Sequence, residues 1–167
     1  MTRPGERALV VTVSDRSSRG ERPDTGGPLL AGLLTDLGLE VAGPVLVPDE
    51  VDAVREALRT AVAQGYDLVV TTGGTGLSPR DVTPEATAAL LDRRVEGVEE
   101  ALRARGAAVV ATAVLSRGLV GTIGRTLVVN LPGSTGGVRD GVAVLAPVLA
   151  HALAQLRGGD DHGPPSP

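Results

Sequence analysis

The sequence predicts an α/β fold, a three-layer α/β/α sandwich built on a mostly parallel sheet. Short apolar runs rich in β-branched residues, such as 8–13 and 68–70, have the length and composition of buried strands. Between such runs lie segments whose apolar residues recur with helical spacing, so strands and helices alternate along the chain. With 167 residues the chain has the length of one domain, which we expect to span 7–157 between disordered segments at 1–6 and 158–167.

Turn and capping residues bound the expected elements. Gly38 is suited to end the first helix, and Gly43-Pro44 inside the second strand predicts an edge position or a bend. Asp49 can cap the second helix, and Thr83 can cap a third that has Pro84 at its first position. In chain order we expect a strand at 8–13, a helix at 28–37, a strand at 40–47, a helix at 51–64, a strand from 68, a helix from 83 to 91, a helix at 95–106, a short strand at 120–123, a turn at 124–125, a strand at 126–130 and a helix at 138–156.

Composition excludes several classes of function. The net charge is −4 and aromatic residues make up 1% of the chain, so we expect no nucleic-acid partner. Cysteine is absent, which excludes disulfides, thiolate catalysis and zinc–thiolate centres. All basic residues are Arg, which excludes Schiff-base chemistry and a P-loop lysine. His151 and His162 lie far along the chain from the glycine-rich segment described below, so we expect no His-based triad or metal cluster.

The remaining side chains limit what a metal site could be. The ligands that this chain can offer a metal are oxygen atoms, which suits Mg²⁺. The apolar runs are short and interrupted, so we expect no membrane partner and a cytoplasmic protein.

The segment 68–87 organises the chain. The strand from Leu68 breaks into 71–76 (TTGGTG), where three glycines in four residues allow the backbone to turn its N–H groups toward a phosphate. Ser78, Arg80 and Asp81 follow, and then the helix predicted from Thr83. A glycine-rich turn after a strand is also a common connection without a ligand, so GGTG alone is weak evidence. The joint pattern of loop, cation, acid and helix start favours a site at the carboxyl end of the strand.

Acidic residues follow two other strands. Ser14 and Asp15 come directly after the first strand, and Asp49 follows the second, so all three are expected at the edge where ligands bind in such sheets. Each also has a structural alternative: Ser14 and Asp15 can form a turn, and Asp49 can cap a helix. Asp24 can likewise cap a helix or contact a ligand. Asp81 lies two residues before a helix start that Thr83 already caps, so capping does not account for it.

Arginine must provide any cationic contact to an anion. Arg80 follows the glycine-rich loop and is the first candidate, and Arg117 is the second. The alternative is that either one is a surface residue paired with a carboxylate. We expect Glu99, Glu100 and Arg103 to lie on the solvated face of a helix.

These motifs resemble the MogA/MoaB-type family of molybdenum-cofactor biosynthesis proteins. The matching segments run in the family's order from 7 to 157, and TTGGTG with RDVTPEAT and LPGS are the most specific among them. They are TVSDR at 12–16, the turn at 24–26, PDE at 48–50, TTGGTG at 71–76, RDVTPEAT at 80–87, EGVEEALR at 96–103, LSRG at 115–118 and NLPGS at 130–134. At 97–100 this chain has Gly-Val-Glu-Glu where the family usually has Gly-Phe-Gly-Glu.

The resemblance implies a three-layer α/β fold, a homotrimer (hexamers occur among MoaB-like members) and binding of molybdopterin, a pterin dithiolene phosphate. In MogA-like members it implies Mg²⁺/ATP-dependent adenylylation of that phosphate before molybdenum is inserted, which would make a molybdenum-insertion protein a partner. A non-catalytic pterin-binding scaffold of the MoaB type is the alternative. By the same resemblance, Asp49 and Asp81 are the catalytic and metal-binding carboxylates, and the GGTG loop is the nucleotide phosphate site.

Motifs and resemblance together give the candidate ligand-binding residues. They are Ser14, Asp15, Asp24, Gly26, Thr72, Gly73, Gly74, Thr75, Gly76, Ser78, Arg80, Thr83, Glu100, Ser116, Arg117, Pro132, Gly133 and Ser134.

Overall fold

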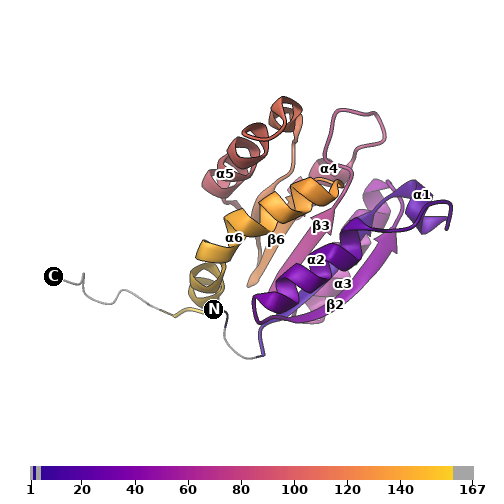
Figure 1. The fold of residues 1–167 in the computed structure, drawn as a ribbon. Coiled ribbons are helices and arrows are strands. Elements are labelled where there is room, and N and C mark those ends of the chain that lie inside the picture. Colours follow the sequence, from indigo (N-terminus) through magenta and orange to yellow (C-terminus); the bar gives the residue numbers. More distant parts are fainter. Residues whose placement is uncertain (1, 3–4, 160–167) are drawn as a thin grey trace.

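A computed structural model of the chain describes residue 2 and residues 5–159 (Figure 1). Its centre is one six-stranded sheet with the order β2-β1-β3-β6-β5-β4. The strands are β1 (Arg7–Val13), β2 (Glu40–Val47), β3 (Leu68–Thr72), β4 (Arg93–Arg94), β5 (Val120–Ile123) and β6 (Thr126–Leu131). The pairs β1/β2, β1/β3 and β3/β6 are parallel, whereas β5 pairs antiparallel with both β4 and β6. The predicted α/β fold is confirmed, and β2 lies at the edge that its Gly-Pro pair predicts.

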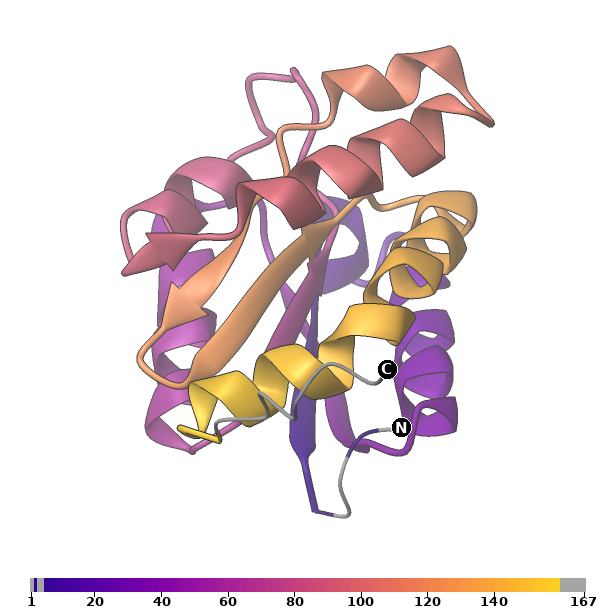
Figure 2. The same cartoon turned by 90° about the vertical axis from the view of Figure 1, so that its left-hand side faces the viewer.

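Helices cover both faces of the sheet (Figure 2). They are α1 (Asp15–Ser18), α2 (Gly26–Asp36), α3 (Val51–Ala63), α4 (Thr83–Ala88), α5 (Glu96–Ala107), the 3₁₀ helix η1 (Ala111–Leu115) and α6 (Thr135–Leu156). Side chains alternate along each central strand, so the core consists of two clusters. Val10 of β1 packs with α2 and α6 on one face, and Leu9 packs with α3 and α4 on the other. These two clusters hold the strand ends in fixed positions at one edge.

Two predicted helix caps are wrong. Val82 occupies the cap position of α4, and Thr83 lies inside the helix and donates its hydroxyl to the carbonyl of Gly73, at 3.0 Å. Glu50, whose side chain makes no capping bond, precedes α3, and the Asp49 carboxylate turns away to another strand end. In both cases a partner from outside the helix replaces the local capping bond.

The described residues near the chain ends make contacts with the domain. The Thr2 hydroxyl donates to the carbonyl of Leu37, at 2.8 Å, and the buried carboxylate of Glu6 pairs with Arg157, at 3.1 Å. The rest of the expected terminal segments, residues 1, 3–4 and 160–167, lies outside the described residues.

Among the described residues, α6 is the one helix long and apolar enough to cross a membrane by length and composition. Its Leu145, Leu149 and Leu153 are buried against the sheet and α2, which is the burial pattern of a core helix.

Candidate functional site

The carboxyl ends of β1, β3 and β6 meet at one edge of the sheet, where the two small-residue loops come together. The backbone N–H of Gly73 donates to the carbonyl of Leu131, at 3.0 Å. The Thr72 hydroxyl donates to the carbonyl of Pro132, at 2.8 Å. The structure therefore brings the TTGGTG loop and the LPGS loop into contact, as the two predicted ligand loops require.

Glycine is required where the first loop turns. Gly73 and Gly74 have φ angles of 102° and 65°, in the left-handed region that side chains disfavour. A Cβ on Gly73 would also overlap the carbonyl oxygen of Val13. The backbone of this loop thus passes directly over the end of β1.

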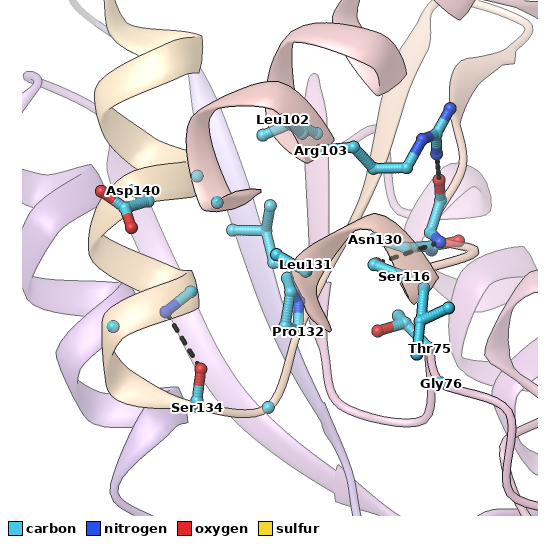
Figure 3. Close-up of a pocket in the computed structure, with 18 of the residues that line it drawn as sticks. Thr75, Gly76, Leu102, Arg103, Ser116, Asn130, Leu131, Pro132, Ser134 and Asp140 are labelled. Carbon is cyan, nitrogen blue, oxygen red and sulfur yellow. Dashed lines mark hydrogen bonds between the residues drawn. The ribbon is translucent and has the colours of Figure 1, made fainter. Parts of the chain in front are cut away.

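The larger of the two pockets that lie beside these loops, about 470 Å³, opens between the TTGGTG loop, α5 with η1, and the start of α6. Figure 3 shows Asp140 and Ser134 on one side of it, Thr75, Gly76 and Ser116 on the other, and Leu102 above. Nine candidate residues line it: Gly73, Gly74, Thr75, Gly76, Asp81, Ser116, Pro132, Gly133 and Ser134.

A smaller pocket, about 360 Å³, lies next to the start of α2. The candidate residues in its lining are Ser14, Asp24, Gly26, Thr72, Gly73, Gly133 and Ser134. Gly73, Gly133 and Ser134 therefore belong to both linings. We call these three residues the shared wall.

Asp24 makes the local bond that its capping alternative predicts, and its contact with a ligand stays a prediction. One carboxylate oxygen accepts the backbone N–H of Gly27 at 2.9 Å, as a cap of α2 does, and the other accepts the Thr12 hydroxyl at 2.8 Å. The same residue lines the smaller pocket. Ser14 also lines this pocket, and its hydroxyl caps α1 by accepting the N–H of Ser17 at 3.2 Å.

Asp15 and Asp49 bind each other reciprocally across two strand ends. The backbone N–H of Asp15 donates to the Asp49 carboxylate at 2.8 Å, and the N–H of Asp49 donates to the Asp15 carboxylate at 3.0 Å. The Arg80 guanidinium forms an ion pair with Asp15. Asp15, Asp49 and Arg80 line neither pocket, although Asp49 lies behind the loop at Gly74.

The pKa values of Asp15 and Asp49 are shifted in opposite directions. The N–H of Asp49 holds the pKa of Asp15 below its usual value, and Arg80 adds to the effect against the opposing effect of burial. Burial raises the pKa of Asp49, and the charges of Asp15 and Asp81 add to this, although the N–H of Asp15 opposes it. A half-buried carboxylate among like charges gains from a nearby cation.

Asp81 has a local bond as well as a position in the larger pocket. Its carboxylate accepts the backbone N–H of Ser78 at 3.0 Å, which closes the turn that carries Arg80. The described residues contain no group of three or more His, Cys, Asp or Glu side chains that could hold a metal. Asp49 and Asp81 are a pair of oxygen donors, and Mg²⁺ commonly uses one or two carboxylates and completes its shell with water and phosphate oxygens. The residues present therefore fit Mg²⁺.

Arg80 and Arg117, the two arginines predicted to contact an anionic ligand, are both paired with carboxylates. This pairing is the alternative stated for them above. Arg80 pairs with Asp15, and Arg117 pairs with Glu85. Neither arginine lines either of the two pockets described above. Ser78 and Thr83 lie close to the loop but also outside both linings.

Sequence reasoning missed three charged residues of the larger pocket, Glu99, Arg103 and Asp140. Glu99 and Arg103 line it, whereas the predicted Glu100 is exposed and lies outside it. The expected solvated face is thus wrong for Glu99, which is 1% exposed and accepts the N–H of Val120 at 3.0 Å. Arg103 is the basic residue of the larger pocket within the described part of the chain, and its guanidinium lies 3.9 Å from the Glu99 carboxylate and 3.4 Å from the carbonyl of Gly118. The four-residue spacing of Glu99 and Arg103 was the available signal.

The family comparison matches residues 9–151 to the family described as "Probable molybdopterin binding domain". Molybdenum cofactor biosynthesis protein B from Staphylococcus carnosus is 38% identical over 155 residues, which are 90% of each chain. The molybdenum cofactor biosynthesis bifunctional protein of Synechococcus elongatus is 43% identical over 159 residues, or 95% of this chain and 50% of that protein. This chain thus spans about half the length of that relative.

Among solved structures, a molybdopterin biosynthesis protein from Mycobacterium abscessus is 50% identical to this chain. It superposes with a TM-score of 0.88, covering 93% of this chain and 98% of that one.

Proposed function

Because this chain belongs to the family of molybdopterin-binding domains that the motifs indicated, we propose that it binds molybdopterin and transfers AMP to it from ATP with Mg²⁺. The observation that carries the proposal is the pair of pockets joined at the shared wall. A transfer between two substrates needs two adjoining cavities whose reacting groups meet. The shared wall comes from the glycine loop and the start of α6, and Asp81 lines the larger pocket.

The reaction is a substitution at phosphorus. An oxygen of the molybdopterin phosphate attacks the α-phosphorus of ATP and a new P–O bond forms. The bond from that phosphorus to the bridging oxygen breaks, and pyrophosphate leaves with the electron pair. The protein supplies no nucleophile, so positioning and charge neutralisation provide the rate enhancement.

The residues of the larger pocket have matching roles. Backbone N–H groups of the loop at 73–76 and of the α6 start bind phosphate oxygens. Arg103 contributes positive charge, because it lines the larger pocket and its ion pair with Glu99 is long, at 3.9 Å. Arg80 and Arg117 line neither pocket and form closer ion pairs with carboxylates. Asp49 and Asp81 would hold Mg²⁺, which when bound neutralises phosphate charge and aligns the reacting groups.

A direct assay tests the proposal. Incubation of the chain with molybdopterin, ATP and Mg²⁺ should yield pyrophosphate and adenylylated pterin in equal amounts. Arg103→Ala should weaken ATP binding, because a charge-assisted contact contributes about 1.5–3 kcal/mol. Arg125→Ala removes the same charge from an exposed turn and should leave binding unchanged. Unaltered affinity in Arg103→Ala would remove that residue from the site.

One observation favours a non-catalytic scaffold as the second candidate. Asp49 lines neither pocket and its carboxylate is engaged by the N–H of Asp15. A scaffold would bind molybdopterin, and the same incubation would release no pyrophosphate. Assembly as a homotrimer and hand-over to a molybdenum-insertion protein stay predictions of the family resemblance, and light scattering would measure the first.

A further inference from the structure

Arg117 connects two segments that the fold brings together beside the larger pocket. It follows η1 and Ser116, and its backbone N–H donates to the carbonyl of Thr75 in the glycine loop, at 2.8 Å. Its side chain is about one-third exposed, at 34%. Arg117 therefore joins the segment after η1 to the loop after β3. Its partner Gly76 in that loop lies 41 positions earlier in the sequence.

The guanidinium group engages three partners around the loop. Its Nε donates to the carbonyl of Gly76 and one Nη donates to the carbonyl of Asp81, both at 2.9 Å. The other Nη forms an ion pair with Glu85 in the first turn of α4. Because of that bond from Arg117, the pKa of Glu85 lies below its usual value. One planar group thus ties the first and last residues of the 76–81 turn to the following helix.

These contacts leave Arg117 unsuited to hold an anionic ligand. Its charge is balanced by the carboxylate of Glu85, and two more of its donors already serve carbonyl oxygens. It is absent from the lining of both pockets. An incoming phosphate would have to break the ion pair and open the turn.

The turn that Arg117 holds is the one that presents Asp81. The Asp81 carboxylate bonds to the N–H of Ser78 and lies against Gly76, so the turn at 76–81 sets where this carboxylate stands in the larger pocket. We propose that Arg117 is a positioning residue, which fixes the 76–81 turn and through it places Asp81 for the reaction. This inference rests on the proposed function and replaces the anion-binding role predicted for Arg117.

The geometry predicts that lysine cannot replace this arginine. The bonds to Gly76 and Asp81 come from two atoms of one rigid fork, whereas an ammonium is a single point with no fixed spacing between donors. Arg117→Lys keeps the charge but loses the distance that the guanidinium imposes. An anion ligand, by contrast, would keep much of its binding to a lysine.

Three variants test the inference: Arg117→Ala, Arg117→Lys and the control Arg157→Ala. Arg157 is equally exposed, at 33%, and pairs with Glu6 and Asp67 away from both pockets. Hydrogen exchange of the amides at 76–81 should quicken in both Arg117 variants and stay unchanged in the control. Both should also lower kcat by about 10²-fold, the loss that a misplacement of about 1 Å can cause, and leave the Kd for ATP within about twofold. Because Asp81 is a proposed Mg²⁺ ligand, the Mg²⁺ concentration for half-maximal rate should rise.

The alternative results are distinct. Unchanged exchange at 76–81, or a weaker ATP affinity that Arg117→Lys restores, would overturn the positioning role. A loss of melting temperature with kcat intact would also overturn it and leave a purely structural arginine. If the wild type releases no pyrophosphate, the proposed transfer fails, and the exchange measurement alone then decides whether Arg117 holds the turn.

Discussion

Asp49 shows how one residue can be held firmly and still be electrostatically unfavourable. Its bond with the N–H of Asp15 fixes the carboxylate, while burial and the charges of Asp15 and Asp81 raise its pKa. A carboxyl whose pKa is raised by folding binds its proton more tightly in the native state. The stability that this carboxyl contributes is therefore lost as the pH rises from its unfolded-state pKa, 3.8, through its higher native-state pKa.

Asp49→Asn should therefore raise the melting temperature at pH 7. The amide oxygen can still accept the N–H of Asp15, but the charge is gone. The gain should shrink as the pH falls and vanish below the unfolded pKa, where the wild-type carboxyl is protonated in both states. Thermal unfolding followed between pH 3 and pH 7 measures this, and Asp52→Asn, fully exposed on α3, controls for net charge. Equal shifts in both variants would contradict the explanation.

At the scale of elements, Glu99 joins α5 to the sheet. It is buried, binds Arg94 next to the start of the helix at 2.6 Å, and accepts the N–H of Val120 in β5. Burial opposes ionisation of Glu99, but the bonds from Arg94 and Val120 outweigh it and keep the pKa below the usual value. The stabilisation from this charge is present above the unfolded pKa of 4.5 and is lost as the pH falls through the native value.

Glu99→Ala should destabilise the protein by about 1–3 kcal/mol at pH 7, because it leaves the Val120 N–H without its acceptor. Glu99→Gln should lose less and should match the wild type at a pH below the native pKa of Glu99, where the wild-type carboxyl is neutral. Urea unfolding at pH 7 and at acidic pH measures both effects. The control is Glu96→Gln on the same helix, 72% exposed, which should change little at either pH. A gap between Glu99→Gln and wild type that stays constant with pH would exclude the charge as its cause.

The positions of helices and strands were more predictable from the sequence than the contacts that side chains make between them. Runs such as 8–13 and 126–130 appear as strands because their β-branched residues suit a buried sheet whatever its neighbours are. The cap roles predicted for Asp49 and Thr83 were wrong, because each side chain binds the backbone at the end of another strand. Asp49 accepts the N–H of Asp15 after β1, and Thr83 donates to the carbonyl of Gly73 after β3. Local sequence cannot reveal such partners. Glu99 was missed for the same reason, since its acceptor role depends on β5 lying beside α5.

At the scale of the molecule, one sheet separates two apolar clusters that depend on each other. Leu58 of α3 and Leu145 of α6 are buried on opposite faces, and both clusters include residues of β1, β3 and β6. Loss of packing on one face removes support from the strands that the other face needs. The two faces should therefore unfold together.

Leu58→Ala and Leu145→Ala should each reduce the free energy of unfolding by about 2–5 kcal/mol through the cavity that they leave. Each variant should still unfold in one transition, with circular dichroism at far and near ultraviolet wavelengths changing at the same denaturant concentration. Val114→Ala, at a site 58% exposed, should change stability little. A second transition in either leucine variant would show that the faces are independent.

The shared wall also has a consequence for ligands that span it. Gly73, Gly133 and Ser134 border both cavities, so a ligand that reaches these residues in one cavity lies beside the other cavity. The second half of a linked compound would then bind at a high effective concentration, without the translational entropy cost of a separate encounter. Such a bivalent ligand should bind more tightly than either half, and its optimal linker should be short.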